Sequence, residues 1–209
     1  MMSKMNNTID FYYSFVSPYS YLAFTQIHKL AEKYQATVCS HPLPVSELME
    51  IVGNVPTTLR CKNKFHYTLN DLNRWSDQYG VELKLTPHLG KVDDARLLRG
   101  AQAAIEQGQI ERYNSAIYKA IWVDRKDVAE KKTLGNALRQ EGLNMDTLFE
   151  YADSIIAHEY QQSSLASAAE KGIFGTPAIF YKDVQYFGND RLGFLEKELF
   201  EHLYPTVEA

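Results

Sequence analysis

The first element that the hydrophobic pattern predicts is a strand over residues 9–16. β-Branched and aromatic residues follow one another there with almost no breaking residue, which is typical of a strand buried on both faces of a sheet. The run leads directly into Ser17-Pro18, after which apolar residues recur at helical spacing up to Tyr34. A second strand is predicted over residues 36–42. Residues 9–42 therefore have the pattern of a βαβ unit with parallel strands.

The segment 45–171 has the pattern of one helix after another. Its only strand-like stretch is residues 81–85. Glycine and proline interrupt the helical periodicity at several places, as expected at helix ends. The predicted helices cover residues 64–78, 93–107, 110–122, 131–140 and 147–170.

The strand pattern returns near the C-terminus. Residues 177–181 and 184–187 flank a Lys182-Asp183 turn and predict a hairpin, and a closing helix begins near Asn189-Asp190. The order βαβ, helices, ββα predicts an α/β protein with an all-helical insertion. Its expected domains are residues 1–44 together with 172–209, and residues 45–171.

Composition narrows the classes of function. The chain has 209 residues, of which 45% are hydrophobic and 23% charged, as in globular proteins. A net charge of -4 argues against a nucleic-acid partner. No stretch approaches the roughly 20 apolar residues of a membrane span, and the N-terminus lacks the apolar core of a signal peptide. We therefore expect a cytoplasmic protein without a membrane partner.

The chain has 2 cysteines, Cys39 and Cys61. They lack the close spacing of a redox pair and the further ligands of a zinc site. Both are expected to be free thiols, with Cys39 buried in its strand, and no metal site is predicted.

The Ser17-Pro18-Tyr19-Ser20 motif follows the first strand. Its simplest interpretation is a helix cap, because serine is favoured at the N-cap and proline at the first helical position. A helix N-terminus at the end of a central strand also stabilises an anion such as a thiolate. The two interpretations are compatible.

Gly175-Thr176-Pro177 enters the third predicted strand. Pro177 is either an ordinary strand entry or part of a cis peptide. A cis bond would turn the Thr176 N–H and C=O outward, where they can pair with an extended peptide ligand.

Phe187-Gly188-Asn189-Asp190-Arg191 opens the closing helix. Asn189 or Asp190 fits a helix cap after a glycine turn. The same cap offers N–H groups to a carboxylate, and Asp190 offers a counter-charge to an ammonium group. A γ-glutamyl group carries both.

These motifs occur together in a known family. They are residues 10–23, Gly53-Asn54, residues 64–67 with 71–75, residues 172–177 and residues 187–192. Over nearly its whole length the chain resembles the family of 2-hydroxychromene-2-carboxylate isomerases and kappa-class glutathione transferases, relatives of the DsbA oxidoreductases. The resemblance implies a DsbA-like thioredoxin-like domain with a helical insertion, and glutathione as cofactor.

The resemblance also implies roles for residues of this chain. Ser17 would hydrogen-bond the glutathione sulfur, and Thr176, before a cis Pro177, would pair with the cysteinyl backbone. The segment Phe187-Gly188-Asn189-Asp190 would bind glutathione, with Asn189 and Asp190 at its γ-glutamyl end.

Three further residues are candidates by the same resemblance. Asn54 is similar to the family's asparagine near the reacting centre. Lys62 and Lys64 are candidates for a carboxylate of glutathione or of the substrate. The chain has Met49 where some members carry a basic residue, at a position expected to face the second substrate.

Dithiol oxidoreductases of this fold begin the helix with Cys-x-x-Cys, whereas this chain has Ser17-Pro18-Tyr19-Ser20 and cannot itself exchange disulfides. The resemblance implies a glutathione-dependent isomerase that acts on a conjugated aromatic keto acid by reversible thiolate addition. The alternatives are a kappa-class-like transferase that conjugates an electrophile, and a non-catalytic glutathione- or peptide-binding module. Family members are commonly homodimers, and a homodimer is expected here.

Overall fold

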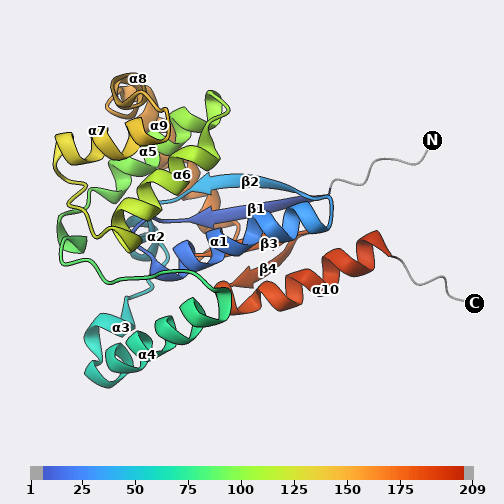
Figure 1. Ribbon diagram of the computed structural model, residues 1–209. Coiled ribbons are helices and arrows are strands. Elements are labelled where there is room, and N and C mark those ends of the chain that lie inside the picture. The colour runs from blue at the N-terminus through green and yellow to red at the C-terminus, as the bar shows by residue number, and fades with distance from the viewer. Residues whose placement is uncertain (1–6, 205–209) are drawn as a thin grey trace, which may run out of the picture.

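A four-stranded sheet lies at the centre of the computed structural model, which describes residues 7–204 (Figure 1). Its strand order is β2-β1-β3-β4. β1 pairs in parallel with β2 and antiparallel with β3, and β3 pairs antiparallel with β4. The strands are β1 (Thr8–Tyr13), β2 (Thr37–Pro42), β3 (Ala178–Tyr181) and β4 (Val184–Phe187). The predicted βαβ unit and C-terminal hairpin are thus confirmed, and they share one sheet.

β1 differs from its prediction in length and burial. It ends at Tyr13 rather than at residue 16. Ile9, Phe11 and Tyr13 are fully buried, while the alternate residues of the strand are partly exposed. Burial on both faces was therefore wrong, because only one face of β1 is completely covered.

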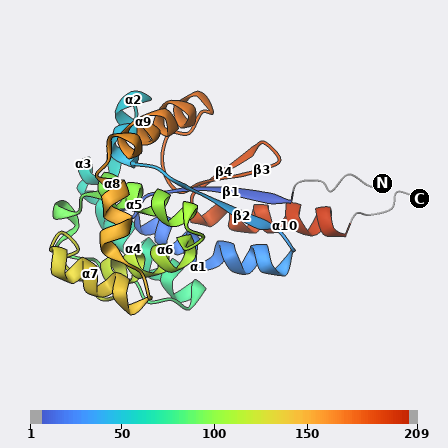
Figure 2. The ribbon, with the colours of Figure 1, turned by 90° about the horizontal axis from the view of Figure 1, so that it is seen from above.

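Helices cover the two faces of the sheet unequally. α1 (Pro18–Lys33) and α10 (Leu192–Leu203) pack on the face of Phe11 and contribute Ile27, Leu195 and Leu199 to the main core. α2 (Val45–Ile51) and α9 (Ile155–Glu170) pack on the other face in a smaller cluster. Figure 2 shows α1 and α9 on opposite sides of the sheet.

The remaining helical elements fill the predicted insertion and the start of the last helix. None of the helices within residues 7–204 is long and apolar enough to cross a membrane. α2 and α3 were not predicted as separate helices, and residues 81–85 form no strand. The elements are α3 (Thr57–Arg60), α4 (Lys62–Tyr79), η1 (Leu89–Lys91), α5 (Asp94–Glu106), α6 (Ile110–Tyr118), η2 (Lys119–Val123), α7 (Lys131–Gln140), α8 (Met145–Ala152) and η3 (Asn189–Arg191).

The helix predicted over residues 147–170 is two helices. α8 ends at Ala152, and Ser154 caps α9 by accepting a hydrogen bond from the Ala157 N–H at 3.2 Å. The buried Arg99 donates from Nε to the Ala152 carbonyl at 2.6 Å and from Nη1 to Gln161 Oε1 at 3.0 Å. A side chain from α5 thus satisfies the end of α8, which the local sequence pattern does not reveal.

Cys39 is exposed, so its predicted burial was wrong. It lies on β2, which is an edge strand of the sheet, and its side chain is on the incompletely covered face. Cys39 and Cys61 are both free thiols, as expected.

The helices of the segment 45–171 lie in more than one place (Figure 1). α4 packs beside α1, where the Tyr19 hydroxyl donates to Asp71 Oδ2 at 2.9 Å. The helices α5 to α8 gather beyond β2, away from α4, and contribute side chains to the main core that α1 also forms. The division into residues 1–44 with 172–209 and residues 45–171 stays a prediction.

Gly100 allows α5 to pack closely against α6. A Cβ at this position would overlap the Tyr113 hydroxyl, which donates to the Leu97 carbonyl at 2.8 Å. We expect Gly100→Ala to lower the free energy of unfolding by about 1–3 kcal/mol, the range of overpacked cores. Urea denaturation measures this change.

Gly193→Ala is the matched control in α10. In the described part of the chain, no neighbouring heavy atom lies within 4 Å of the added carbon there. Its effect on the free energy of unfolding should stay below about 1 kcal/mol. Equal losses in the two variants would contradict the tight contact between α5 and α6.

Candidate functional site

Ser17 stands at the point where the chain leaves β1 and enters α1. Its Oγ accepts a hydrogen bond from the Ser20 N–H at 3.2 Å, and Pro18 is the first residue of the helix. The predicted helix cap is therefore present. The free N–H groups and the dipole of this helix end favour a negative charge beside Ser17.

The loop before β3 faces Ser17. The bond between Thr176 and Pro177 is cis, and Pro177 directly precedes β3. Ser17 Oγ donates to the Thr176 carbonyl at 3.2 Å, although the two residues are 159 positions apart in the chain. Thr176 Oγ1 is buried without a hydrogen-bond partner among the described residues.

Asn54 and Phe187 lie against the same loop. Asn54 Nδ2 donates to the Phe174 carbonyl at 2.7 Å. A Cβ on Gly175 would come within 3.1 Å of the Phe187 ring and 3.8 Å of Met49. The structure thus brings Ser17, Asn54 and Phe187 around one loop.

The Gly188-Asn189-Asp190 turn is tied to this loop as well. The Gly188 N–H donates to the Pro177 carbonyl at 3.0 Å, and its φ of 97° favours glycine. Asn189 is 2% exposed, and its carbonyl accepts a hydrogen bond from the Tyr79 hydroxyl at 2.8 Å. Asp190 is exposed and pairs with Arg191 at 2.7 Å. The Asn189 side chain therefore lies inside the protein, while the Asp190 carboxylate is at the surface.

Lys62 and Lys64 lie at the exposed start of α4. Lys64 Nζ donates to the Thr57 hydroxyl. Within residues 7–204, no hydrogen bond or ion pair links either lysine to Ser17 or Thr176. The structure does not join them to the rest of the candidate site.

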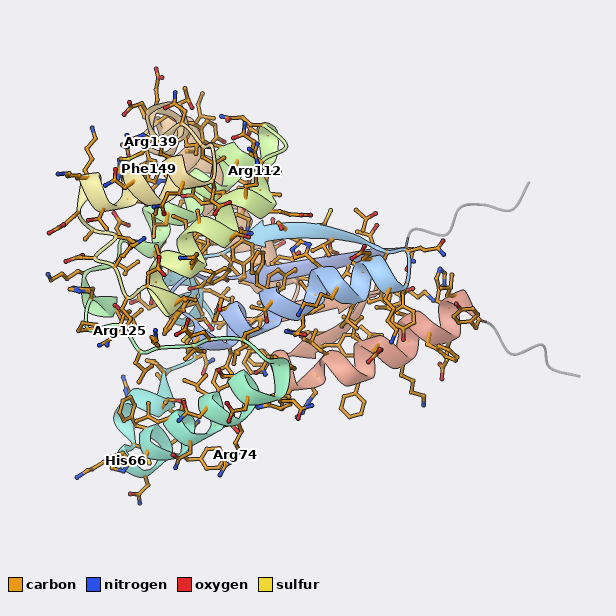
Figure 3. The ribbon with its side chains drawn as sticks, viewed as in Figure 1. His66, Arg74, Arg112, Arg125, Arg139 and Phe149 are labelled. Atoms are coloured by element: carbon orange, nitrogen blue, oxygen red, sulfur yellow. The ribbon has the colours of Figure 1, made fainter. Side chains whose placement is uncertain are left out.

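A cleft of about 700 Å³ runs beside Asn189 and Asp190, between α1, α4 and α10. Figure 3 shows Arg74 extending from α4. The charged residues that line the cleft include the predicted Asp190. The sequence interpretation did not assign a site role to the others, which are Lys29, Lys33, Asp71, Arg74 and Glu196. The i,i+3 spacing of Asp71 and Arg74 places them on one side of a helix, but the sequence does not show which neighbour that side meets.

Side chains from the helical segment hold the turn between β1 and α1. Asp94 Oδ2 accepts from the Ser14 hydroxyl at 2.8 Å, and Asp94 Oδ1 accepts from the Phe15 N–H at 3.0 Å. The Tyr118 hydroxyl donates to the Ser14 carbonyl at 3.3 Å, and Trp122 Nε1 donates to the Phe15 carbonyl at 2.8 Å. The position of Ser17 therefore depends on α5, α6 and η2.

Asp94 is a titratable group within this frame. Burial raises its pKa to about 7, and the hydrogen bonds from Ser14, Phe15 and Val16 offset only part of this effect. Sequence reasoning missed Asp94, because an aspartate in the first helical turn ordinarily faces solvent.

Comparison with known proteins places this geometry in a family. A model of the DSBA-like thioredoxin domain matches residues 8–200. The 2-hydroxychromene-2-carboxylate isomerase of Sphingobium xenophagum is 31% identical over 201 residues, which cover 94% of this chain and 100% of that protein. The chain belongs to the DSBA-like thioredoxin family, together with these isomerases.

Further relatives of the chain agree with this assignment. A solved structure of a 2-hydroxychromene-2-carboxylate isomerase superimposes with a TM-score of 0.84 at 27% identity, covering 93% of this chain and 95% of that chain. The glutathione S-transferase kappa 1 of Rattus norvegicus is 21% identical over 100% of this chain and 99% of that protein. The predicted DsbA-like fold is confirmed.

The raised pKa of Asp94 predicts a pH-dependent stability. Asp94 has an ordinary pKa of 3.8 when unfolded and about 7 when folded, so between these values the folded state holds a proton that the unfolded state has lost. The stabilisation by neutral Asp94 is therefore complete below about pH 4 and is lost as the pH rises through about 7.

Asp94→Asn tests this dependence, because an amide reproduces the hydrogen bonds of a protonated carboxyl. The free energy of unfolding of the wild type, relative to Asp94→Asn, should fall by on the order of 3 kcal/mol between about pH 4 and pH 8. Urea denaturation at several pH values gives this difference. Asp93→Asn changes the exposed cap of the same helix, and its free energy of unfolding should depend on pH as that of the wild type does. If the free energies of unfolding of Asp94→Asn and the wild type changed equally with pH, the raised pKa of Asp94 would be refuted.

Proposed function

We propose that this chain is a glutathione-dependent isomerase of the 2-hydroxychromene-2-carboxylate isomerase type, acting on a conjugated aromatic keto acid. The observation that carries the proposal is the 31% identity to such an isomerase over 94% of the chain. The geometry of Ser17, at a helix N-terminus beside the Thr176 carbonyl, supports a site for a thiolate.

Ser17 would hold a thiolate rather than attack the substrate. Within the described chain its Oγ hydrogen-bonds the Ser20 N–H and the Thr176 carbonyl, and neither group is a base that can remove its proton. The hydroxyl can rotate from Thr176 towards a bound sulfur and donate to it. Lowering a thiol pKa of about 8.5 by two units takes about 2.7 kcal/mol, which suits one charge-assisted hydrogen bond at a helix N-terminus.

The residues around Ser17 suit the groups of glutathione. When bound, glutathione supplies a thiolate that adds reversibly to the double bond of the substrate and leaves after rotation, so glutathione is not consumed. Thr176 offers its backbone N–H and C=O to the cysteinyl group, beside Pro177, while Asn54 keeps the loop in place through Phe174.

The γ-glutamyl end would lie at the Gly188-Asn189-Asp190 turn. Because the Asn189 side chain is buried, its backbone is what the turn can present to a carboxylate. Asp190 offers a negative charge to the ammonium group, and Lys29 and Arg74 bring positive charge to the neighbouring cleft. A cleft with charges of both signs fits a ligand that is itself zwitterionic.

The second substrate would meet an apolar rim next to Asn54 and Gly175. Large apolar side chains there are 40% to 55% exposed: Ile51, Val55, Phe174 and Phe187. An aromatic substrate can stack on such side chains. Lys62, exposed at the start of α4, stays a candidate for a substrate carboxylate, as does Lys64.

A second candidate function is transfer of glutathione to an electrophile, which the 21% identity to glutathione S-transferase kappa 1 over the whole chain favours. Quantifying glutathione after turnover separates the two functions, because an isomerase returns it and a transferase leaves a conjugate. A non-catalytic glutathione- or peptide-binding module would show binding and no turnover. We also propose a cytoplasmic homodimer, which rests on the family resemblance.

Ser17→Ala tests the proposed role of the hydroxyl. We expect the glutathione-dependent isomerisation of 2-hydroxychromene-2-carboxylate to slow about 10²-fold, the usual cost of losing one donor to a reacting anion. The pKa of bound glutathione, read from the ultraviolet absorbance of its thiolate, should rise in the same variant.

Ser154→Ala is the matched control. It removes a helix cap of the same type and length, 3.2 Å, far from Ser17 in the chain. Both variants should lose about 1 kcal/mol of stability, but Ser154→Ala should keep full activity. Equal activity in both variants, or equal rates with and without glutathione, would overturn the proposal.

A further inference from the structure

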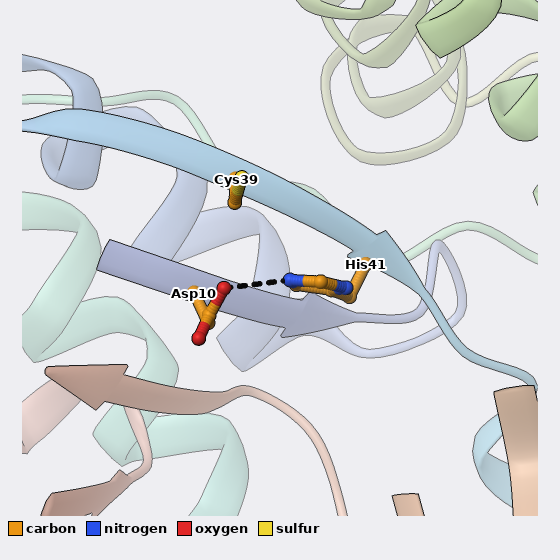
Figure 4. Close-up of side chains that lie close together, drawn as sticks. All are labelled: Asp10, Cys39 and His41. Carbon is orange, nitrogen blue, oxygen red and sulfur yellow. Dashed lines mark hydrogen bonds and ion pairs between the residues drawn. The ribbon is translucent and has the colours of Figure 1, made fainter. Parts of the chain in front are cut away.

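We propose that Asp10, Cys39 and His41 form a zinc-binding site on the sheet face opposite α1. The three side chains come from β1 and β2 and lie close together in Figure 4. Their possible ligand atoms all lie within 4.8 Å of one another. The family assignment and the proposed glutathione chemistry do not account for this cluster.

Strand register brings the three residues together. In the parallel pair, Asp10 is opposite Cys39 and Tyr12 is opposite His41. Alternate residues of a strand point to the same face, so Asp10, Cys39 and His41 share one face, with Cys39 beside Asp10 and His41 diagonal to it. The sequence did not predict this group, because its members lie in two separate strands.

The present geometry is close to that of a zinc site. His41 Nε2 and Asp10 Oδ1 are 2.8 Å apart. Around a tetrahedral zinc ion with ordinary bond lengths, ligand atoms are separated by about 3.3–3.7 Å. Side-chain rotations that move atoms by about 1 Å would reach this arrangement, since all three residues are at least partly exposed.

The donor set selects the kind of metal. A thiolate, an imidazole and a carboxylate are ligands of zinc and similar transition metals, whereas magnesium and calcium prefer sets of oxygen atoms. Three protein ligands leave a fourth position for water. The thiolate and carboxylate together neutralise the charge of the divalent ion.

Neighbouring side chains contact two of the ligands. The His41 ring stacks on Tyr12, with ring centroids 4.4 Å apart and planes at 13°. Lys171 Nζ lies 3.6 Å from Asp10 Oδ2, on the oxygen that does not contact His41. The lysine ammonium is also 4.2 Å from the Phe180 ring centroid. Lys171 thus orients the carboxylate, as a partner beyond the metal ligands often does, and its charge moderates the affinity for a cation.

The site is separate from Ser17. Asp10 points to the face that carries α9, whereas the buried neighbours Ile9 and Phe11 face α1. Zinc binding therefore needs none of the residues in the proposed glutathione site. The proposal stands whatever the outcome of the isomerase assay.

Metal titration of the full chain tests the proposal. Zinc added in competition with a chromogenic chelator should bind at one equivalent per chain, and cobalt should give a near-ultraviolet thiolate-to-metal absorption band. Cys39→Ser should abolish this band and weaken zinc binding at least about tenfold. His41→Ala should weaken zinc binding similarly.

Matched variants separate this site from other cysteines and histidines. Cys61→Ser and His66→Ala replace exposed residues of the same types outside the cluster, and both should bind zinc like the wild type. Circular dichroism checks that every variant is folded. Absence of the cobalt band in the wild type, its persistence in Cys39→Ser, or its loss in Cys61→Ser would each overturn the assignment.

Discussion

The hydrogen bonds from the helical segment to the turn between β1 and α1 fix the rest of the site. Ser14 and Phe15 are fully buried, but both lie beyond the end of β1. Their buried backbone groups therefore need hydrogen-bond partners outside the sheet. Asp94, Tyr118 and Trp122 provide those partners. The start of α1 is thereby held by helices that come much later in the chain, so the sheet and the helical segment depend on each other.

The polar groups around the loop before β3 serve the fold in different ways. Thr176, Asn54 and Gly188 use backbone or amide atoms to join the loop before β3 to its neighbours. These atoms are therefore occupied within the fold. The Ser17 hydroxyl differs, because its hydrogen can turn to a ligand while its oxygen still caps the helix. One side chain can thus serve the fold and bind a ligand.

Side chains of β1 point alternately to the two faces of the sheet, and the two faces differ in their chemical environment. The aromatic residues on one side complete the main core, and Asp10 on the other side meets two polar residues of an edge strand. Because β2 has no further strand beside it among residues 7–204 and its outer residues are incompletely covered, polar and reactive side chains remain accessible there. The edge position of β2 and the incomplete cover of this face therefore explain both the exposure of Cys39 and the difference in burial between the two faces.

Local pattern by itself determined the order of strands and helices, the parallel βαβ unit, the hairpin and the cap at Ser17, because periodicity, turn residues and caps are properties of neighbouring residues. The motifs also led to the family and to most of the candidate residues. Tertiary structure alone decided the break between α8 and α9, the burial of Asn189, the hydrogen bonds of Asp94 to Ser14 and Phe15, and the contact between Asp10 and His41. Each of these depends on a partner distant in the chain, such as Arg99 at the Ala152 carbonyl, and a single sequence carries no direct signal for such contacts.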